Sequence, residues 1–188
     1  MQINPEFIIY TGCMFSSKST MLLSTLEKFK YQHRKIVAFK PTIDDRYGND
    51  EIVTHGGWRV PATRIKIGAD ILERLAEIPD SPPQVIAVDE AFMIPGIAEV
   101  LIWLYQRGFT IVVSTLELSS SGKPFHEVEK MLVWATSVKK CTAVCTTCGN
   151  DAHYTYKKQT GGSEIEIGGD ELYEPRCFKC HPFFQLNL

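Results

Sequence analysis

A lysine and a serine close a loop-like octapeptide at residues 12–19. The segment matches the phosphate-loop pattern G-x-x-x-x-G-K-[ST] at three of its four fixed positions, because Ser17 stands where the pattern has its second glycine. In such a loop, backbone N–H groups surround the phosphates, the lysine contacts the β and γ groups, and the serine hydroxyl coordinates Mg²⁺. Lys18 and Ser19 suit the last two tasks. Taken alone, the octapeptide is also compatible with helix-capping serines and a solvent-facing lysine.

Two adjacent carboxylates follow an apolar run at residues 85–88. Ligands of open α/β sheets bind at the carboxyl ends of strands, so we expect Asp89 and Glu90 to face the same crevice as the phosphate loop. Asp89 suits Mg²⁺, directly or through water, which leaves Glu90 to take a proton from an acceptor hydroxyl. Either carboxylate alone is compatible with helix capping before Pro95, but their coincidence with the loop favours phosphoryl chemistry.

Two Cys-x-x-Cys pairs lie in the last quarter of the chain and are separated by 28 residues. Four thiolates in paired knuckles bind Zn²⁺ tetrahedrally, so Cys145, Cys148, Cys177 and Cys180 are predicted zinc ligands. Metal binding would supply the folding free energy that a segment with few apolar residues lacks.

Other uses of these cysteines are less consistent with the sequence. The second pair and His181 match the C-x-x-C-H haem-attachment pattern, but haem attachment requires an export signal and leaves the first pair unexplained. Replacement of Cys180 by His181 as a ligand stays open. Cys13 and Cys141 are expected to pack as small apolar side chains.

The elements that must position these residues alternate between strands and helices up to about residue 141. We expect strands at 7–10, 36–39, 85–88 and 110–113, and an extended segment at 137–142. Apolar residues at helical spacing predict helices that contain Leu22, Leu26 and Phe29, then Ile71, Leu72 and Leu75, then Ile97, Val100, Leu101 and Leu104, and finally residues 125–135. This pattern predicts an α/β fold with a parallel sheet and helices on both faces.

The character of the chain changes after Val144. Polar strands are expected around Tyr154 and Ile165, with a hairpin between the cysteine pairs. We therefore predict two domains, at 1–143 and 144–188.

Composition narrows the class of protein. The 188 residues are 44% hydrophobic and 22% charged, as in ordinary globular domains, and the formal net charge of -2 disfavours a nucleic-acid partner. No signal sequence or membrane span is recognisable, so the expected compartment is the cytoplasm.

Four motifs, in order along nearly the whole chain, together resemble one family. They are a loop of the form Gly-x-Met-Phe-x-x-Lys-Ser-Thr, an Asp-Glu at a strand end, a Lys-Pro-Phe after a later strand, and a C-terminal zinc ribbon that encloses Ile-Gly-Gly-x-x-x-Tyr. In this combination the chain is similar to the type II thymidine kinases. The resemblance implies a RecA-like P-loop core, ATP as donor, thymidine or a related deoxynucleoside as acceptor, a homotetramer, and a place in nucleotide salvage for DNA synthesis.

The resemblance also implies roles for individual positions. Glu90 matches the general base, and Lys18 and Arg46 assist catalysis. Nucleotide-binding positions are Gly12, Cys13, Met14, Phe15, Ser16, Ser17, Lys18, Ser19, Thr20, Asp44 and Asp89, with Mg²⁺ on Ser19 and Asp89. Nucleoside-binding positions are Met14, Met93, Leu116, Phe125, Thr155, Ile165, Ile167, Gly168 and Tyr173, of which residues 165–173 match a lasso that grips the base.

The chain departs from the family pattern at three places. Family members usually have glycine at position 17, and a positive φ there would cost serine roughly 1–2 kcal/mol. They have Gln and Phe where this chain has Phe92 and Met93, and Asp-Gly-x-Phe-Gln-Arg where residues 117–122 read Glu-Leu-Ser-Ser-Ser-Gly. Ser120 cannot supply the stacking area of a phenylalanine, so the phosphate chemistry is better supported than the choice of base.

Two other functions remain open at this point. In a P-loop ATPase, Glu90 would polarise water and hydrolysis would not need a nucleoside. A nucleotide-binding relic of the family would bind without turnover.

Overall fold

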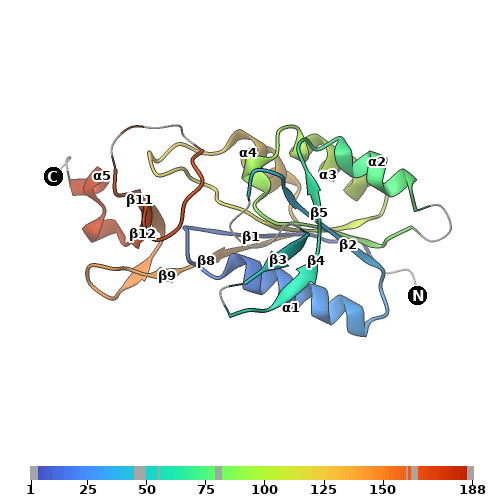
Figure 1. The fold of residues 1–188 in the computed structure, drawn as a ribbon, viewed down its shortest axis with the longest axis horizontal. Helices are drawn as coiled ribbons and strands as arrows, with labels where there is room; N and C mark the ends of the chain where they lie inside the picture. The colour runs from blue at the N-terminus through green and yellow to red at the C-terminus, as the bar shows by residue number, and fades with distance from the viewer. Residues whose placement is uncertain are drawn as a thin grey trace.

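The computed structural model describes residues 4–44, 50–54, 56–78, 82–159, 161 and 165–185. Its centre is a six-stranded sheet in the order β5-β2-β6-β7-β1-β8 (Figure 1). Every neighbouring pair in this sheet runs parallel. The strands are β1 (Phe7–Gly12), β2 (Ile36–Pro41), β5 (Thr63–Ile65), β6 (Val85–Val88), β7 (Thr110–Ser114) and β8 (Ser137–Cys141).

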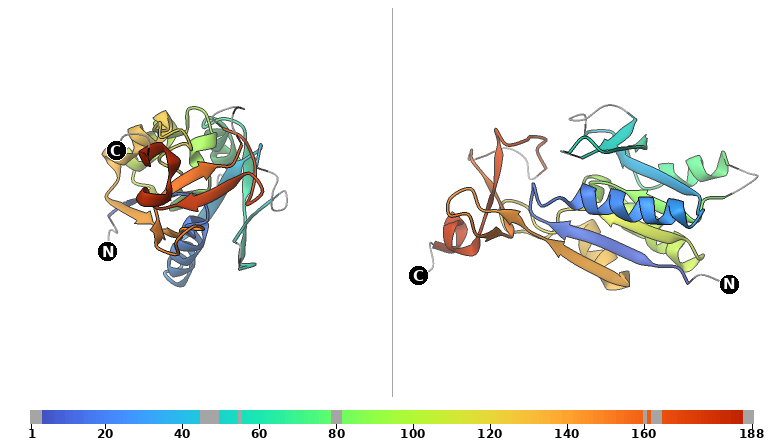
Figure 2. Two further views of the ribbon diagram at one scale, coloured as in Figure 1. Left: turned by 90° about the vertical axis from the view of Figure 1, so that its left-hand side faces the viewer. Right: turned by 90° about the horizontal axis from the view of Figure 1, so that it is seen from below.

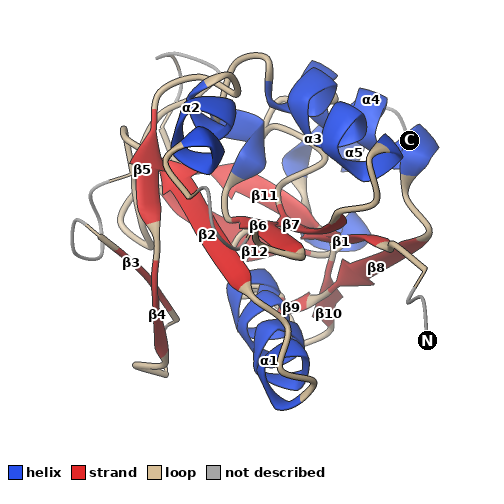
Figure 3. Ribbon diagram, turned by 90° about the vertical axis from the view of Figure 1, so that its right-hand side faces the viewer, coloured by secondary structure: helices blue, strands red, loops and turns tan. Residues whose placement is uncertain are grey.

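Helices cover both faces of the sheet. Helix α1 (Lys18–Tyr31) lies on one face, and α2 (Asp70–Ala76), α3 (Ile97–Gln106) and α4 (His126–Trp134) lie on the other (Figures 1 and 3). The predicted α/β class with a parallel sheet is confirmed. Among the described residues, no helix combines the length and apolarity needed to cross a membrane.

Alternate side chains of each central strand divide between the two layers. In β6, Ile86 and Val88 pack into the core under α3 and α4, whereas Val85 and Ala87 pack into the core under α1. All four are fully buried. A strand that is covered on both faces needs apolar residues at every position, which explains the continuous apolar runs in the sequence.

A hairpin that the sequence analysis missed lies beside α1. It consists of β3 (Glu51–Val53) and β4 (Arg59–Pro61), which pair antiparallel (Figure 3). Only the central residue of each strand, Ile52 or Val60, is buried. A single apolar residue per strand produces no readable periodicity, so the hairpin left no signal in the sequence.

The C-terminal segment lies beyond the carboxyl ends of the sheet strands (Figure 2). There β9 (Ala143–Val144) pairs with β10 (Asp151–Ala152), and β11 (Tyr154–Lys157) pairs with β12 (Tyr173–Arg176). The 3-10 helix η2 (Phe178–Cys180) and helix α5 (Pro182–Gln185) follow.

The strand expected around Ile165 is wrong. Among the described residues of this stretch, 165–172 form no strand, and the partner of β11 is β12 instead. The side chains of Ile165 and Ile167 line a cavity, and two consecutive glycines disfavour an extended strand.

Candidate active site

The phosphate loop begins at the carboxyl end of β1 and requires glycine at its first position. Gly12 has a φ of 136°, and a Cβ on it would lie 2.3 Å from the carbonyl oxygen of Cys141. Phe15 and Ser17 have φ values of 65° and 60°. Position 17 therefore adopts the left-handed backbone considered above, which costs a serine roughly 1–2 kcal/mol.

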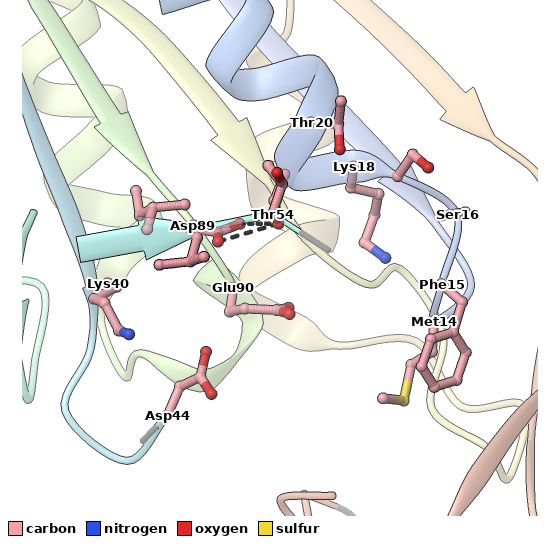
Figure 4. A pocket seen from close by; sticks show the side chains of 14 residues that line it. Met14, Phe15, Ser16, Lys18, Thr20, Lys40, Asp44, Thr54, Asp89 and Glu90 are labelled. Atoms are coloured by element: carbon pink, nitrogen blue, oxygen red, sulfur yellow. Dashed lines mark hydrogen bonds between the residues drawn. The ribbon is translucent and has the colours of Figure 1, made fainter. Parts of the chain in front are cut away.

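The interpretation of the loop as helix-capping serines with a solvent-facing lysine is wrong. Ser17 is the N-cap of α1, but its side chain makes no capping hydrogen bond. Lys18 is only 7% exposed, and its ammonium donates a 2.7 Å hydrogen bond to the carbonyl oxygen of Cys13. The Ser16 hydroxyl donates to the same oxygen at 2.7 Å. The lysine thus lies inside the loop and points into the open space in front of it (Figure 4).

The carboxylate of Asp89 lies next to the start of α1. It accepts hydrogen bonds from the Ser19 hydroxyl, at 3.0 and 3.1 Å, and from the Ser114 hydroxyl. Burial and the neighbouring Glu90 carboxylate raise the pKa of Asp89 to about 6, although both serine hydroxyls favour the charged form. A buried carboxylate beside two hydroxyls is an all-oxygen donor set, which fits Mg²⁺. Ser114 was not predicted from the sequence, and its position at the end of β7 was the available signal.

A cavity of about 70 Å³, here called the phosphate cavity, opens in front of the loop. Of the predicted nucleotide-binding residues, those that line it are Met14, Phe15, Ser16, Ser17, Lys18, Ser19, Thr20, Asp44 and Asp89. Gly12 and Cys13 belong to the loop but do not line this cavity. Arg46 lies outside the described residues.

Two polar residues of the phosphate cavity escaped the sequence analysis. Lys40 is buried at the end of β2, and Thr54 is buried directly after β3 (Figure 4). Lys40 donates to the carbonyl oxygen of Glu51 at 3.2 Å, so its ammonium is positioned by the β3–β4 hairpin. A polar residue at the carboxyl end of a predicted strand was the available signal for Lys40.

A second cavity, the acceptor cavity, lies beside the first. All nine residues predicted to bind the nucleoside line it: Met14, Met93, Leu116, Phe125, Thr155, Ile165, Ile167, Gly168 and Tyr173. Phe92 and Ser120, noted above as departures from the family pattern, line it as well, and so do Ser119 and Glu166, which were missed. The rings of Phe92 and Phe125 pack with their centroids 4.6 Å apart.

Glu90 lines both cavities. It follows the last residue of β6 by two positions and has a φ of 49°, a left-handed conformation that glutamate rarely adopts. Its side chain points into the same open space as Lys18 (Figure 4). Strained backbone of this kind clusters at functional sites, where the surrounding structure holds a side chain in a required direction.

The loop is anchored from behind by Glu117. One carboxylate oxygen of Glu117 accepts hydrogen bonds from the Thr11 hydroxyl and, at 2.6 Å, from the backbone N–H of Gly12. The other oxygen forms a 2.9 Å ion pair with the Lys140 ammonium. Burial disfavours the charged form of Glu117, but the contacts with Thr11 and Lys140 outweigh it and hold its pKa below the ordinary value.

The four predicted zinc ligands form one cluster. The sulfur atoms of Cys145, Cys148, Cys177 and Cys180 all lie within 4.8 Å of one another. A tetrahedron with Zn–S bonds of about 2.3 Å has S–S edges of about 3.8 Å, so the cluster fits a Cys₄ zinc site.

The remaining candidates for metal binding are engaged elsewhere. His181 bonds through Nε2 to the carbonyl oxygen of Thr155 at 3.2 Å and through Nδ1 to the N–H of Phe183 at 3.3 Å, so it does not replace Cys180. Cys13 and Cys141 are buried within apolar clusters, as expected.

The cysteine-rich segment is bonded to the phosphate loop. The backbone N–H of Met14 donates to the Thr155 hydroxyl at 3.0 Å, and the Cys13 thiol contacts the carbonyl oxygen of Ala152 at 3.3 Å. Phe15 packs against the apolar cluster that contains Cys145 and Cys177. The order of this segment is therefore coupled to the order of the loop.

A phosphate loop at the carboxyl edge of a parallel sheet, with an aspartate and a hydroxyl placed for a metal and a second cavity beside it, defines a P-loop phosphotransferase. Comparison with known proteins agrees. Residues 6–181 match the profile of the family described as "Thymidine kinase". A thymidine kinase of Mesoplasma florum is 32% identical over 181 residues, which cover 92% of this chain and 89% of the relative. The chain belongs to the thymidine kinase family, and it is an enzyme that phosphorylates a nucleoside.

Proposed function

We propose that the protein transfers the γ-phosphoryl group of ATP to the 5'-hydroxyl of thymidine or a closely related deoxynucleoside. One observation carries this assignment: Glu90 lines both the phosphate cavity and the acceptor cavity. A general base for phosphoryl transfer must lie where the acceptor hydroxyl meets the phosphate, and Glu90 is the carboxylate at that boundary.

Each residue at the boundary then has a distinct role. Glu90 accepts the proton of the acceptor hydroxyl, and the Lys18 ammonium offsets negative charge on the transferring phosphoryl group. Because Met14 and Glu90 line both cavities, donor and acceptor would be held next to each other, which lowers the entropic cost of their reaction. Arg46 is proposed to assist at the phosphates. Ser19 and Asp89 would hold Mg²⁺, which neutralises phosphate charge when bound.

The C-terminal residues are proposed to bind the nucleoside. We assign residues 1–143 to ATP and residues 144–188 to the zinc ribbon and the lasso. The acceptor cavity supports this division, because Thr155, Ile165, Ile167 and Tyr173 of the C-terminal segment line it. We also propose that the enzyme is a homotetramer that acts in the cytoplasm in nucleotide salvage, where a reducing environment suits a chain whose six cysteines form no disulfide.

The decisive test is a panel of nucleosides incubated with ATP and Mg²⁺, read out as monophosphate and ADP. We expect monophosphate from thymidine and an equal amount of ADP. ADP formation that does not depend on any nucleoside would indicate the P-loop ATPase instead. Binding of ATP and nucleoside without turnover would indicate a relic.

Two variants separate the roles of the paired carboxylates. Glu90→Gln should bind ATP and thymidine nearly normally but transfer phosphate about 10²–10⁴-fold more slowly, the range for a lost acid–base group. Asp89→Asn should instead shift the Mg²⁺ dependence of turnover to higher concentration. An unchanged rate in Glu90→Gln would remove the base assignment, and lost ATP binding would reassign Glu90 to the nucleotide site.

A further inference from the structure

A third cavity, here called the rear cavity, adjoins the acceptor cavity. Three residues line both cavities: Ser119, Ser120 and Thr155. The acceptor cavity encloses about 30 Å³, enough for roughly two or three waters. The rear cavity encloses about 230 Å³. The larger space therefore adjoins the smaller one across a wall that these three residues form.

Short side chains form this shared wall. The Ser119 hydroxyl is held in its turn, because it bonds the Ser121 hydroxyl at 2.9 Å and accepts from the N–H of Lys123 at 3.2 Å. The Ser120 hydroxyl, in contrast, has no hydrogen-bond partner among the residues that the structure describes. Ser120 can therefore rotate at little cost, and its single hydroxymethyl group is a small barrier between the two spaces.

The rear cavity is lined by aromatic rings and by polar side chains, among them Glu117, whose carboxylate is already bonded to Gly12 and Lys140. Tyr154, Phe183 and Phe184 contribute rings, and Tyr154 and Phe184 pack with centroids 4.7 Å apart. His181 is fixed by its bonds to Thr155 and Phe183. An apolar cavity with a few placed polar groups is the usual form of a small-molecule site, and aromatic walls favour a flat apolar ligand.

We propose that the rear cavity extends the nucleoside site and accepts an apolar or aromatic arm on the base. The substrate range would then include pyrimidine deoxynucleosides whose ring carries a substituent much larger than a methyl group. The arm would pass Ser120 and stack among Tyr154, Phe183 and Phe184. This proposal rests on the proposed nucleoside kinase function, whose failure the following experiment detects separately.

The test compares thymidine with two armed substrates, 2'-deoxyuridine with a phenylethynyl group on C5 and 2'-deoxyuridine with a benzyl group on N3. The kcat/KM for monophosphate formation is measured for each. We expect at least one armed substrate to reach about a tenth of the thymidine value or more. Turnover of thymidine without turnover or binding of either armed substrate would overturn the proposal and leave the proposed function intact.

Variants at the shared wall make the test specific. In the series Ser120→Val, Ser120→Leu and Ser120→Phe, the ratio of armed-substrate to thymidine kcat/KM should fall with side-chain volume, by at least tenfold in Ser120→Phe. The matched control is Lys123→Phe, because Lys123 is exposed in the same loop, lines neither cavity and bonds Ser119 only through its backbone atoms. It should leave the ratio unchanged. If Ser120→Phe fails to fold, the two smaller substitutions carry the test.

If thymidine is not phosphorylated, calorimetric measurement of binding tests whether the rear cavity is a ligand site. In that case the proposed function fails on its own. Binding of an armed deoxyuridine to the wild-type protein that is lost in Ser120→Leu would still support the rear cavity as its site. Absent binding, or equal binding to both proteins, would overturn the proposal.

Discussion

Three side chains at the active site are held by backbone that non-glycine residues disfavour. Phe15, Ser17 and Glu90 all have positive φ, and all three line the phosphate cavity. Each conformation costs roughly 1–2 kcal/mol, which packing elsewhere must offset. At Glu90 the strain directs a carboxylate toward both cavities. At Ser17 it has no comparable consequence, because the side chain makes no capping bond.

This difference between the two positions predicts that Ser17→Gly stabilises the protein. Glycine adopts a φ of 60° without the Cβ penalty, so the free energy of unfolding should rise by about 1 kcal/mol and ATP affinity should stay equal or improve. Urea unfolding and ATP titration measure the two effects. Ser16→Gly is the matched control, and it should lose stability because the Ser16 hydroxyl bonds Cys13. Weaker ATP binding in Ser17→Gly would mean that the serine side chain has its own role.

The ion-paired carboxylate of Glu117 predicts how the stability of the protein depends on pH. Its pKa is lowered on folding, so its contribution to stability is present above the unfolded carboxyl pKa of about 4.3 and is lost as the pH falls through the folded value. The difference in unfolding free energy between wild type and Glu117→Gln should therefore be largest near pH 6 and shrink toward pH 3. Glu99→Gln removes an exposed partner of Lys130 and should change stability little at any pH. A difference for Glu117→Gln that does not vary with pH would contradict the assigned ion pair.

At the scale of elements, the phosphate loop is held from two directions. Glu117 bonds its start from the β7 side, and the strands β10 and β11 bond its middle through Ala152 and Thr155. The loop therefore depends on a segment that is more than a hundred residues away in sequence. Zinc bound at the cysteine cluster would order this segment, because few apolar side chains are available to do so.

Loss of the zinc site should consequently loosen the phosphate loop as well. We expect about one Zn per chain in the purified protein, and Cys145→Ser or Cys177→Ser should lose the metal. Hydrogen exchange should then rise at residues 145–180 and also at Met14, whose N–H bonds Thr155. Cys141→Ser is the matched control, because Cys141 lies outside the cluster. A folded, freshly purified sample without zinc would contradict the site, and unchanged exchange at Met14 would contradict the coupling.

For the whole molecule, the proposed homotetramer predicts a definite mass. Light scattering after gel filtration should give the mass of four 21.2 kDa chains. The surface offers apolar area for association, since Val133 is 84% exposed at the end of α4 and Val138 is 47% exposed on the edge strand β8. A single-chain mass at micromolar concentration would refute the tetramer without affecting the assignment of the active site.

Much of the core could be read from the sequence because its signals are local. The four apolar runs, the helix stripe through Leu22 and Leu26, and the α/β order follow from patterns within a dozen residues. Lys18, Ser19 and Asp89 were found because each stands in a short motif or directly after a strand. The cysteine pairs were readable for the same reason, since their spacing is itself the signal.

The remaining features depend on contacts between distant segments. Lys40 and Ser114 join the site because β2 and β7 end at the same edge of the sheet as β6, and Thr54 joins it because the β3–β4 hairpin packs beside α1. The strand expected at Ile165 was wrong because the partner of β11 lies further along the chain. No local pattern encodes a contact between residues a hundred positions apart. The position of Glu90 between two cavities, and the short wall at Ser120, arise only when the chain folds and encloses space from both sides.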